Sequence, residues 1–331
     1  MSAMLNSSRA LNIAIHTLGL LSLATISKNS LSTIWRYFIR PTCNIKKLYN
    51  TSSVLTKHNI STWVIITGGS EGIGLELAKI FAKQGLSIIL IARDMNKLIH
   101  AQNELLKEFK GIEVKVFSMD VSNADENVFN QFKSFIESDF ISILVNNVGV
   151  HNDIPTNVVD MNSNEVRRII NVNCTFQVEF TSLIIPKLQQ TAAVTRKKSL
   201  VMNISSLTSK MAMPMLSLYA ATKAFEEHFS LSLAAELAPD RIDCLCLRPG
   251  ITVSRMSGIK VPSYFCPSAK DMAHSIVNQI SSAGNDVTVV PYFPHSILDY
   301  INSLVPQQIS WGIVREMHNV KRKLLLEQKS E

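Results

Sequence analysis

The chain has 331 residues, enough for one large α/β domain with an appendage and a sizeable core. Its net charge of +7 comes from residues 1–60, which contain seven Lys or Arg and no Asp or Glu, because the 26 basic and 26 acidic residues of the remainder cancel. This distribution argues against a nucleic-acid-binding domain, and five cysteines without C-x-x-C spacing argue against a disulfide framework or a metal site.

Residues 10–26, ALNIAIHTLGLLSLATI, form an apolar segment at the short end of the length of a bilayer span. A membrane anchor, a cleaved signal peptide and a mitochondrial transit peptide all fit an acid-free, Ser-rich N-terminus. A transit helix interleaves Arg with apolar residues and this segment contains none, so we favour the anchor. Five basic residues follow it within residues 28–47 and one precedes it, which predicts that the downstream chain faces the cytosol. We expect residues 1–60 to be an anchor with a basic linker, and residues 61–331 to be the main domain.

The stretch TWVIITGGSEGIG at residues 62–74 predicts a buried strand, a glycine-rich turn and the start of a helix that ends near Gly85. The glycines are spaced as Gly68-x-x-x-Gly72-x-Gly74. Glycines at such a turn let the backbone approach a pyrophosphate, and the helix N-terminus supplies N–H donors. The stretch therefore predicts a dinucleotide site.

The next apolar run, SIILIA at residues 87–92, predicts a second strand that ends at Arg93. An acid at this point binds the ribose 2′-hydroxyl of NAD, whereas an arginine suits the 2′-phosphate of NADP. Asp94 is one position late for the NAD role, and we expect it to be the N-cap of the following helix. Arg93 thus favours NADP(H).

Strands and helices continue to alternate after residue 94. Apolar runs predict strands at residues 112–119, 141–145, 199–205 and 241–247 with a short seventh at 286–290, and helical periodicity spans 164–186 and 217–238. The fold class expected is α/β: a Rossmann-like doubly wound parallel sheet with helices on both faces, plus the N-terminal anchor and a C-terminal helical extension from about residue 292. Ligands of such sheets bind at the carboxyl ends of the strands.

A tyrosine and a lysine stand four residues apart in SLYAATKAF, at residues 217–225. Tyr219 and Lys223 therefore lie on one face of the predicted helix. A neighbouring ammonium favours the phenolate and lowers the pKa of a phenol, so the pair could serve as a general acid at neutral pH.

Six motifs in register make residues 62–255 resemble the short-chain dehydrogenase/reductases. They are the glycine turn preceded by Thr67, Asp120-Val121, Asn146-Asn147-Val148-Gly149, Asn173, Ser206 with Tyr219-x-x-x-Lys223, and Pro249-Gly250. Three features narrow the resemblance: the sequence NNVG, the N-terminal apolar segment and the C-terminal extension. With them the chain resembles the membrane-bound branch that contains the 17β-hydroxysteroid dehydrogenases of types 3 and 12. Type 12 is also called very-long-chain 3-oxoacyl-CoA reductase.

The resemblance implies a catalytic Ser-Tyr-Lys set assisted by an asparagine. Ser206 would bind the substrate carbonyl, and Tyr219 would donate a proton to it. Lys223 would bind the nicotinamide ribose, and Asn173 would hold a water that relays protons to it. Asp120 would meet the adenine amino group and Asn146 the adenine ribose. The residues implied to bind NADP(H) are Thr67, Gly68, Ser70, Gly72, Ile73, Gly74, Arg93, Asp120, Val121, Asn146, Tyr219, Lys223, Pro249, Gly250, Thr252 and Ser254, the last in place of the family's Thr.

The function implied is NADPH-dependent reduction of a lipid carbonyl, either a 3-oxoacyl-CoA or a 17-oxosteroid. Met211, Met213 and Met215 fit core packing or an apolar wall of the substrate pocket, and residues 255–266 have the length of a lid loop. Two rival functions remain: NAD-dependent oxidation of a retinol-type or other lipid alcohol, and a non-catalytic nucleotide-binding scaffold. The expected partners are a small lipid substrate, the membrane and a second copy in a homodimer. The expected location is the endoplasmic reticulum membrane, with the mitochondrion as the alternative.

Overall fold

The structure is a computed structural model that describes residues 16–17, 19–20, 31–40, 45–49, 62–282 and 286–330. The chain divides into two compact units, Met1–Thr42 and Cys43–Glu331. In the first unit the structure describes a π-helical turn, η1 (Trp35–Ile39). The expected anchor, residues 10–26, lies largely outside the described residues. Among those that are described, we find no helix with both the length and the apolar character that a bilayer crossing requires.

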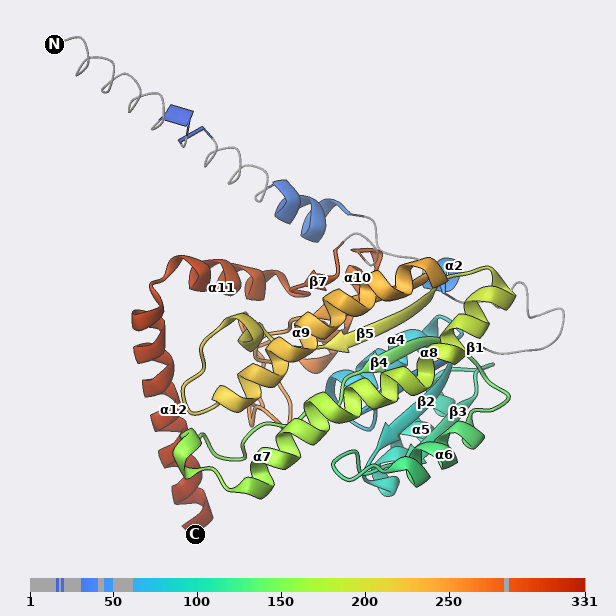
Figure 1. Cartoon of the computed structure of the whole chain (residues 1–331), viewed down its shortest axis with the longest axis horizontal. Coiled ribbons are helices and arrows are strands. Elements are labelled where there is room, and N and C mark those ends of the chain that lie inside the picture. The colour runs from blue at the N-terminus through green and yellow to red at the C-terminus, as the bar shows by residue number, and fades with distance from the viewer. Residues whose placement is uncertain are drawn as a thin grey trace. The chain divides into compact units, whose positions relative to one another are not determined.

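The second unit is built on one seven-stranded parallel sheet with the order β3-β2-β1-β4-β5-β6-β7 (Figure 1). The strands are β1 (Thr62–Thr67), β2 (Ser87–Ala92), β3 (Val114–Ser118), β4 (Phe140–Asn146), β5 (Ser199–Ile204), β6 (Ile242–Leu247) and β7 (Thr288–Val289). The predicted doubly wound sheet is confirmed. The strand order reverses between β1 and β4, which is the point where such sheets bind their ligands.

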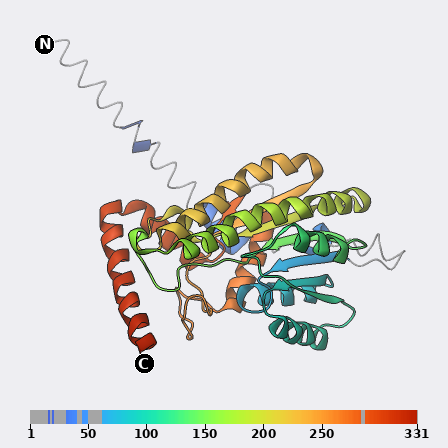
Figure 2. The ribbon, with the colours of Figure 1, turned by 60° about the horizontal axis from the view of Figure 1, so that its bottom comes forward.

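Helices cover both faces of the sheet (Figure 2). On one face α4 (Gly72–Lys83), α5 (Met95–Glu108) and α10 (Ala269–Gln279) bury their apolar sides in a first core. On the other face α6 (Glu126–Phe135), α8 (Phe176–Thr195) and α9 (Ser217–Leu237) form a second core. Strands buried on both faces need continuous apolar runs, which is why β2 reads SIILIA.

The helix expected at residues 164–186 is interrupted. It consists of α7 (Ser163–Ile170), a π-helical turn η4 (Asn171–Thr175) and α8. A π-turn adds a residue to one helical turn and redirects the side chains within it, and such turns are frequent at functional sites. The helix also continues past Pro186 to Thr195, because packing of α8 against β4 outweighs the backbone hydrogen bond that a proline removes.

Part of the segment expected to be a linker belongs to the main unit. Ile45 and Tyr49, at the two ends of the short turn that contains α2 (Ile45–Leu48), are buried in the first core. The Tyr49 hydroxyl donates to Oδ2 of Asp243 on β6 at 2.7 Å. The division at Thr42 therefore lies earlier in the chain than residue 60.

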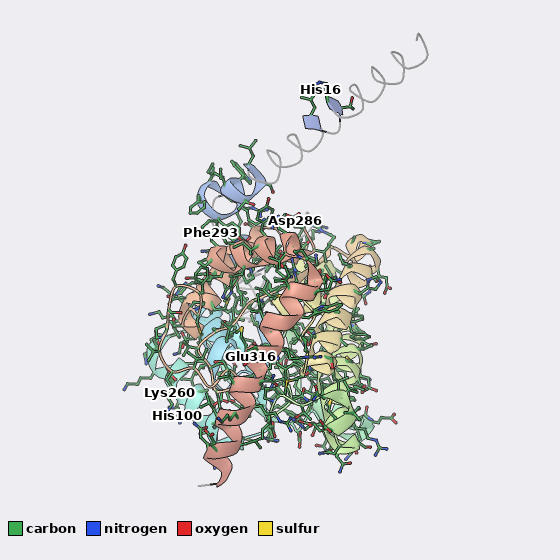
Figure 3. All side chains as sticks on the ribbon, turned by 90° about the vertical axis from the view of Figure 1, so that its left-hand side faces the viewer. His16, His100, Lys260, Asp286, Phe293 and Glu316 are labelled. Carbon is green, nitrogen blue, oxygen red and sulfur yellow. The ribbon has the colours of Figure 1, made fainter. Side chains whose placement is uncertain are left out.

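The C-terminal extension consists of α11 (Phe293–Leu304) and α12 (Gln307–Ser330), and α12 runs along one side of the domain (Figure 3). His318 of α12 bonds to the Pro214 carbonyl through Nδ1 at 2.6 Å, and Arg322 donates to the Pro155 carbonyl at 2.7 Å. Both carbonyls belong to segments that follow the carboxyl ends of β4 and β5. The extension is thus attached at the ligand-binding edge of the sheet.

Candidate active site

The glycine turn between β1 and α4 has positions where only glycine fits. Gly68 and Gly72 have φ angles of +64° and +62°, in the left-handed region that favours glycine. A Cβ on Gly74 would lie 2.3 Å from the Gly68 carbonyl oxygen. Ser70 and Ile73 are half-buried in the same turn. The turn therefore brings the N-terminus of α4 close to the end of β1, as a pyrophosphate site requires.

Thr67 and Asn147 join this turn to the end of β4. The Thr67 hydroxyl accepts from the backbone N–H groups of Asn147 and Val148 at 3.0 and 3.2 Å. The Asn147 side-chain amide donates to the carbonyls of Thr67 and Gly68 at 3.0 and 3.1 Å. Sequence reasoning missed this role of Asn147, although its position directly after a strand in NNVG was a usable signal.

Asn146 faces the protein interior. Its amide nitrogen donates to the Thr181 hydroxyl on α8 and to Oδ1 of Asn203 on β5, both at 2.8 Å. Its own Oδ1 is buried and has no hydrogen-bond partner in the structure, so it retains an acceptor for a ligand or water. The contact between Asn146 and an adenine ribose stays a prediction.

Arg93 and Asp120 are exposed at the carboxyl ends of β2 and β3, and Val121 follows them half-buried. Asp120 accepts from the backbone N–H and hydroxyl of Ser122 at 3.1 and 2.7 Å. Asp94 accepts from two backbone N–H groups at the start of α5, which confirms that it is the N-cap. Asp94 therefore caps α5, and Arg93 is the positively charged side chain that the end of β2 offers to a cofactor.

Ser206, Tyr219 and Lys223 come together at the carboxyl end of β5. Ser206 follows β5, and its hydroxyl lies close enough to the Tyr219 side chain to lower the pKa of the phenol. The Tyr219 ring centroid lies 5.8 Å from Lys223 Nζ and 5.8 Å from the centroid of the His151 ring. The site thus brings together the Ser206 hydroxyl, the Tyr219 phenol and the Lys223 ammonium.

The Lys223 ammonium is buried and has a hydrogen-bond acceptor for each of its three N–H groups. Nζ donates to the Ile204 carbonyl at 3.0 Å and to both carboxylate oxygens of Glu226 at 2.8 and 2.9 Å. A Cβ on Gly149 would lie 3.3 Å from this Nζ, so a larger residue there would press on the ammonium. Sequence reasoning missed Glu226, because nothing in the Tyr-x-x-x-Lys pattern points to the residue three positions later.

The pKa of Tyr219 is raised rather than lowered, so the expectation of a net decrease is wrong. Burial raises the pKa of the phenol, and the negative charge of Glu226 raises it further. The Lys223 ammonium and the nearby Ser206 hydroxyl lower it, but burial outweighs them. Tyr219 is therefore protonated at neutral pH, which is the form of a proton donor.

Asn173 connects the segment after β4 to α9. Its Oδ1 accepts from the Val150 N–H, and its amide nitrogen donates to the Val150 carbonyl and to the Thr222 hydroxyl, each at 2.9 Å. The π-turn η4 gives Asn173 this inward position. Its relay role through a water stays a prediction, and its contacts show that it fixes the backbone beside Lys223.

The loop after β6 is held by the C-terminal extension. The Gly250 N–H donates to Nδ1 of His295 on α11 at 2.9 Å, so the proton of this imidazole is on Nε2, which lies 3.0 Å from the Phe265 carbonyl. Arg248 pairs with Asp299 of α11 at 3.0 Å. Sequence reasoning missed His295 and Asp299, which belong to no local motif.

The remaining predicted cofactor residues lie on the same loop. The buried Thr252 donates through its hydroxyl to the Gly250 carbonyl at 3.2 Å, and Ser254 exchanges hydrogen bonds with Ser257. Pro249 accepts from the N–H of Leu207, the residue that follows Ser206. The site fits a dinucleotide for two reasons. The glycines leave the turn open to a pyrophosphate, and Asn146 Oδ1 at the end of β4 has no hydrogen-bond partner in the structure.

Comparison with protein families gives one match over most of the main unit: the model of the short chain dehydrogenase family matches residues 62–263. The chain is also similar to curated proteins named very-long-chain 3-oxoacyl-CoA reductase. That of Coccidioides immitis is 32% identical over 272 residues, which cover 80% of this chain and 76% of the relative. That of Podospora anserina is 29% identical over 274 residues, with 80% and 79% covered.

Solved structures show the same fold. A short-chain dehydrogenase from Sphingobium yanoikuyae in complex with NADPH aligns with a TM-score of 0.62 at 24% identity and covers 74% of this chain and 93% of its own. A structure from work on 7beta-hydroxysteroid dehydrogenase stereoselectivity aligns with a TM-score of 0.65 at 18% identity, with 79% and 98% covered.

Replacement of Gly74 by alanine is expected to disrupt the glycine turn, because the new Cβ would meet backbone rather than a movable side chain. We expect NADPH binding to weaken about tenfold or more, which is about 1.4 kcal/mol or more, in a fluorescence titration. Gly312→Ala is the matched control, since this helical glycine on α12 has no atom within 4 Å of its Cβ position. The control should keep NADPH affinity and gain about 1 kcal/mol in helix stability. Equal affinities in the two variants would contradict this account.

Burial lowers the pKa of His295 below its ordinary value of 6.5, against the opposing effect of its backbone hydrogen bonds. The unfolded chain therefore binds a proton at this residue before the folded chain does, and stability is lost as pH falls below 6.5. In His295→Asn the free energy of unfolding should be lower than in the wild type at pH 8, and the difference should shrink by pH 5. Chemical denaturation at several pH values measures this. Parallel pH curves for the two chains would show that His295 does not contribute.

Proposed function

Because the chain belongs to the short-chain dehydrogenase family, we propose that it catalyses NADPH-dependent reduction of a lipid carbonyl to a hydroxyl, with a long-chain 3-oxoacyl-CoA as the favoured substrate class. The observation that carries the proposal is the arrangement of Ser206, Tyr219 and Lys223 at the carboxyl end of the sheet. The choice of substrate is supported by the curated relatives, which are named very-long-chain 3-oxoacyl-CoA reductases. A 17-oxosteroid is the second substrate class.

Held at the glycine turn and by Arg93, a bound NADPH would supply the hydride that the carbonyl carbon accepts. The chain's own residues act on the carbonyl oxygen: Ser206 donates a hydrogen bond to it, and Tyr219 transfers its hydroxyl proton to it as negative charge develops. The Lys223 ammonium stabilises the phenolate that Tyr219 becomes. A phenol that is protonated at neutral pH suits this direction of reaction.

An exposed Arg93 at the end of β2 supports the preference for NADPH, because a guanidinium pairs with a phosphate through charged hydrogen bonds. NAD-dependent oxidation of a lipid alcohol is the alternative reaction. A non-catalytic scaffold is disfavoured, because it has no need for a hydroxyl, a phenol and an ammonium gathered at one site.

An apolar substrate is supported by the segment of residues 255–266. Tyr264 and Phe265 of this segment are 61% and 44% exposed. Nε2 of His151, whose ring contacts Tyr219, lies 3.1 Å from the Met256 carbonyl, so the segment begins beside the reacting phenol. Its exposed rings are the surface that we assign to a lipid chain. Between Ser206 and Tyr219 in the sequence, Met211 and Met213 are half-buried, whereas Met215 is buried and fits core packing.

We also propose that residues 10–26 anchor the protein in the endoplasmic reticulum membrane with its catalytic domain in the cytosol, and that α12 lies on the same bilayer. The support for α12 is a stripe of apolar residues, each more than half exposed, next to the buried Val314 and His318. The stripe consists of Ile309, Ile313, Met317, Val320 and Leu324. Lys321 and Lys323 beside it suit anionic headgroups. A homodimer through this stripe is the alternative.

Replacement of Tyr219 by phenylalanine removes the proton donor and keeps the ring. We expect turnover of long-chain 3-oxoacyl-CoAs, followed by loss of NADPH absorbance, to fall about 10³-fold or more, while NADPH binding is retained. Tyr300→Phe is the control, since Tyr300 is 54% exposed on α11. Assays with steroids test the second substrate class. Assays with retinoids and with NADH or NAD in place of the NADP cofactor test the alternative, oxidation of a lipid alcohol. Full activity in Tyr219→Phe, or turnover of alcohols with NAD alone, would refute the proposal.

Membrane attachment is tested with the full chain in cells. The wild type should stay with membranes after an alkaline wash, and Leu20→Arg with Leu21→Arg should release it, since each Arg costs about 2.5–3.5 kcal/mol at the centre of a span. Asn29→Arg with Ser30→Arg is the control outside the segment. The variant with Leu20→Arg and Leu21→Arg should still bind membranes weakly at neutral pH through α12. Adding Met317→Glu to that variant should abolish this binding. A wild type that the wash releases, or a soluble dimer that Met317→Glu dissociates, would contradict the anchor or the placement of α12.

A further inference from the structure

Glu226 is a buried carboxylate that the Ser-Tyr-Lys mechanism does not use. It lies three residues after Lys223 on α9, and 2% of the residue is exposed. Both of its carboxylate oxygens accept from Lys223 Nζ, at 2.8 and 2.9 Å. A carboxylate buried to this extent is costly unless a charge compensates it. Its partner here is the ammonium that the proposed mechanism places behind Tyr219.

This contact determines which way the ammonium points. With two N–H groups on Glu226 and the third on the Ile204 carbonyl, Nζ is directed at α9 and β5, and the Tyr219 ring centroid is 5.8 Å away. The backbone at Gly149 limits movement of Nζ on another side. Glu226 therefore fixes the distance between the positive charge and the phenol.

Glu226 also changes the charge that Tyr219 experiences. Lys223 lowers the pKa of Tyr219, whereas Glu226 raises it, so the carboxylate offsets part of the effect of the ammonium. The neutral phenol is the form that gives a proton to a carbonyl oxygen. The reverse reaction, oxidation of an alcohol, needs the phenolate as the proton acceptor.

The cysteines around Glu226 are neutral at pH 7. Burial raises the pKa of Cys174 on η4 to about 11 and that of Cys246 on β6 to about 12. Glu227 raises the pKa of Cys246 and Arg248 lowers it, and these two residues form an ion pair with each other at 3.9 Å. Burial raises the pKa of Glu226 itself to about 7, against the opposing effect of Lys223. Lys223 is thus charged at neutral pH, and Glu226 is fully charged at the alkaline pH where the phenol of Tyr219 titrates.

Resting on the proposed reductase function, we propose that Glu226 is a positioning residue for the Tyr219–Lys223 pair. Its carboxylate holds the ammonium and offsets part of its charge, which raises the pH at which the Tyr219 phenolate forms and moves alcohol oxidation to higher pH. Glu226 acts through Lys223 and does not touch the substrate.

The first test needs no turnover. Glu226→Gln keeps the shape of the side chain and an acceptor for Lys223 but removes the negative charge. The phenolate absorbance of each chain is titrated with pH, and the titration of the same chain carrying Tyr219→Phe is subtracted to isolate Tyr219. We expect the Tyr219 transition to move to lower pH by about one unit in Glu226→Gln. Glu236→Gln, an exposed position on the same helix, is the control and should leave the transition unchanged.

The second readout is the pH profile of the reaction in both directions. In Glu226→Gln the rise of alcohol oxidation with pH should begin about one unit lower than in the wild type, and Glu226→Asp, which keeps the charge, should restore the wild-type profile. If Glu226→Gln does not fold, Glu226→Met replaces it with the same expectation, because it removes the charge without leaving a buried amide.

A Tyr219 transition that stays in place or moves to higher pH in a folded, charge-free variant overturns the role of Glu226. A wild type that binds NADPH but turns over no lipid carbonyl overturns the proposed function alone, because the absorbance titration does not depend on turnover.

Discussion

The close approach of two backbones at the end of β1 is the constraint on which the site depends. Gly74 lies so near the Gly68 carbonyl that no side chain fits between them. Asn147 binds the same carbonyl and so fixes the end of β4. Two residues later, Gly149 lies close to Lys223 Nζ, so the segment that Asn147 joins to the glycine turn also limits the space available to the ammonium. The glycine turn and the segment beside Lys223 are therefore joined through Asn147.

The chemistry of the site comes from buried charges that nearly cancel. The Lys223 ammonium and the Glu226 carboxylate are both out of water, and each limits the cost of burying the other. Although burial lowers the pKa of Lys223, Glu226 raises it enough that the ammonium stays charged. Tyr219 is left as a neutral acid beside a fixed pair. An enzyme that reduces carbonyls at neutral pH needs this protonation state before the reaction begins.

Local patterns were sufficient to predict the strands, the glycine turn and the Asp94 cap, because each depends on residues close together in the chain. The contacts of His295 and Asp299 join positions about fifty residues apart, and no local pattern reports them. The π-turn at Asn171–Thr175 escaped prediction because its residues also suit an ordinary helix. The direction of the Tyr219 pKa shift depends on how deeply the ring is buried, which only the packed structure reveals. Likewise, the two adjacent asparagines of NNVG look alike in sequence and point to different sides of the strand end.

A single imidazole holds two distant points of the connection between β6 and α10. One nitrogen of His295 holds Gly250 in the coenzyme loop, and the other holds Phe265 in the loop assigned to the lipid. A lipid that displaces Phe265 would therefore pull on the coenzyme loop through one rigid ring. The C-terminal extension, through His295, therefore links the part of this connection that contains predicted cofactor residues to the part that we propose for the lipid.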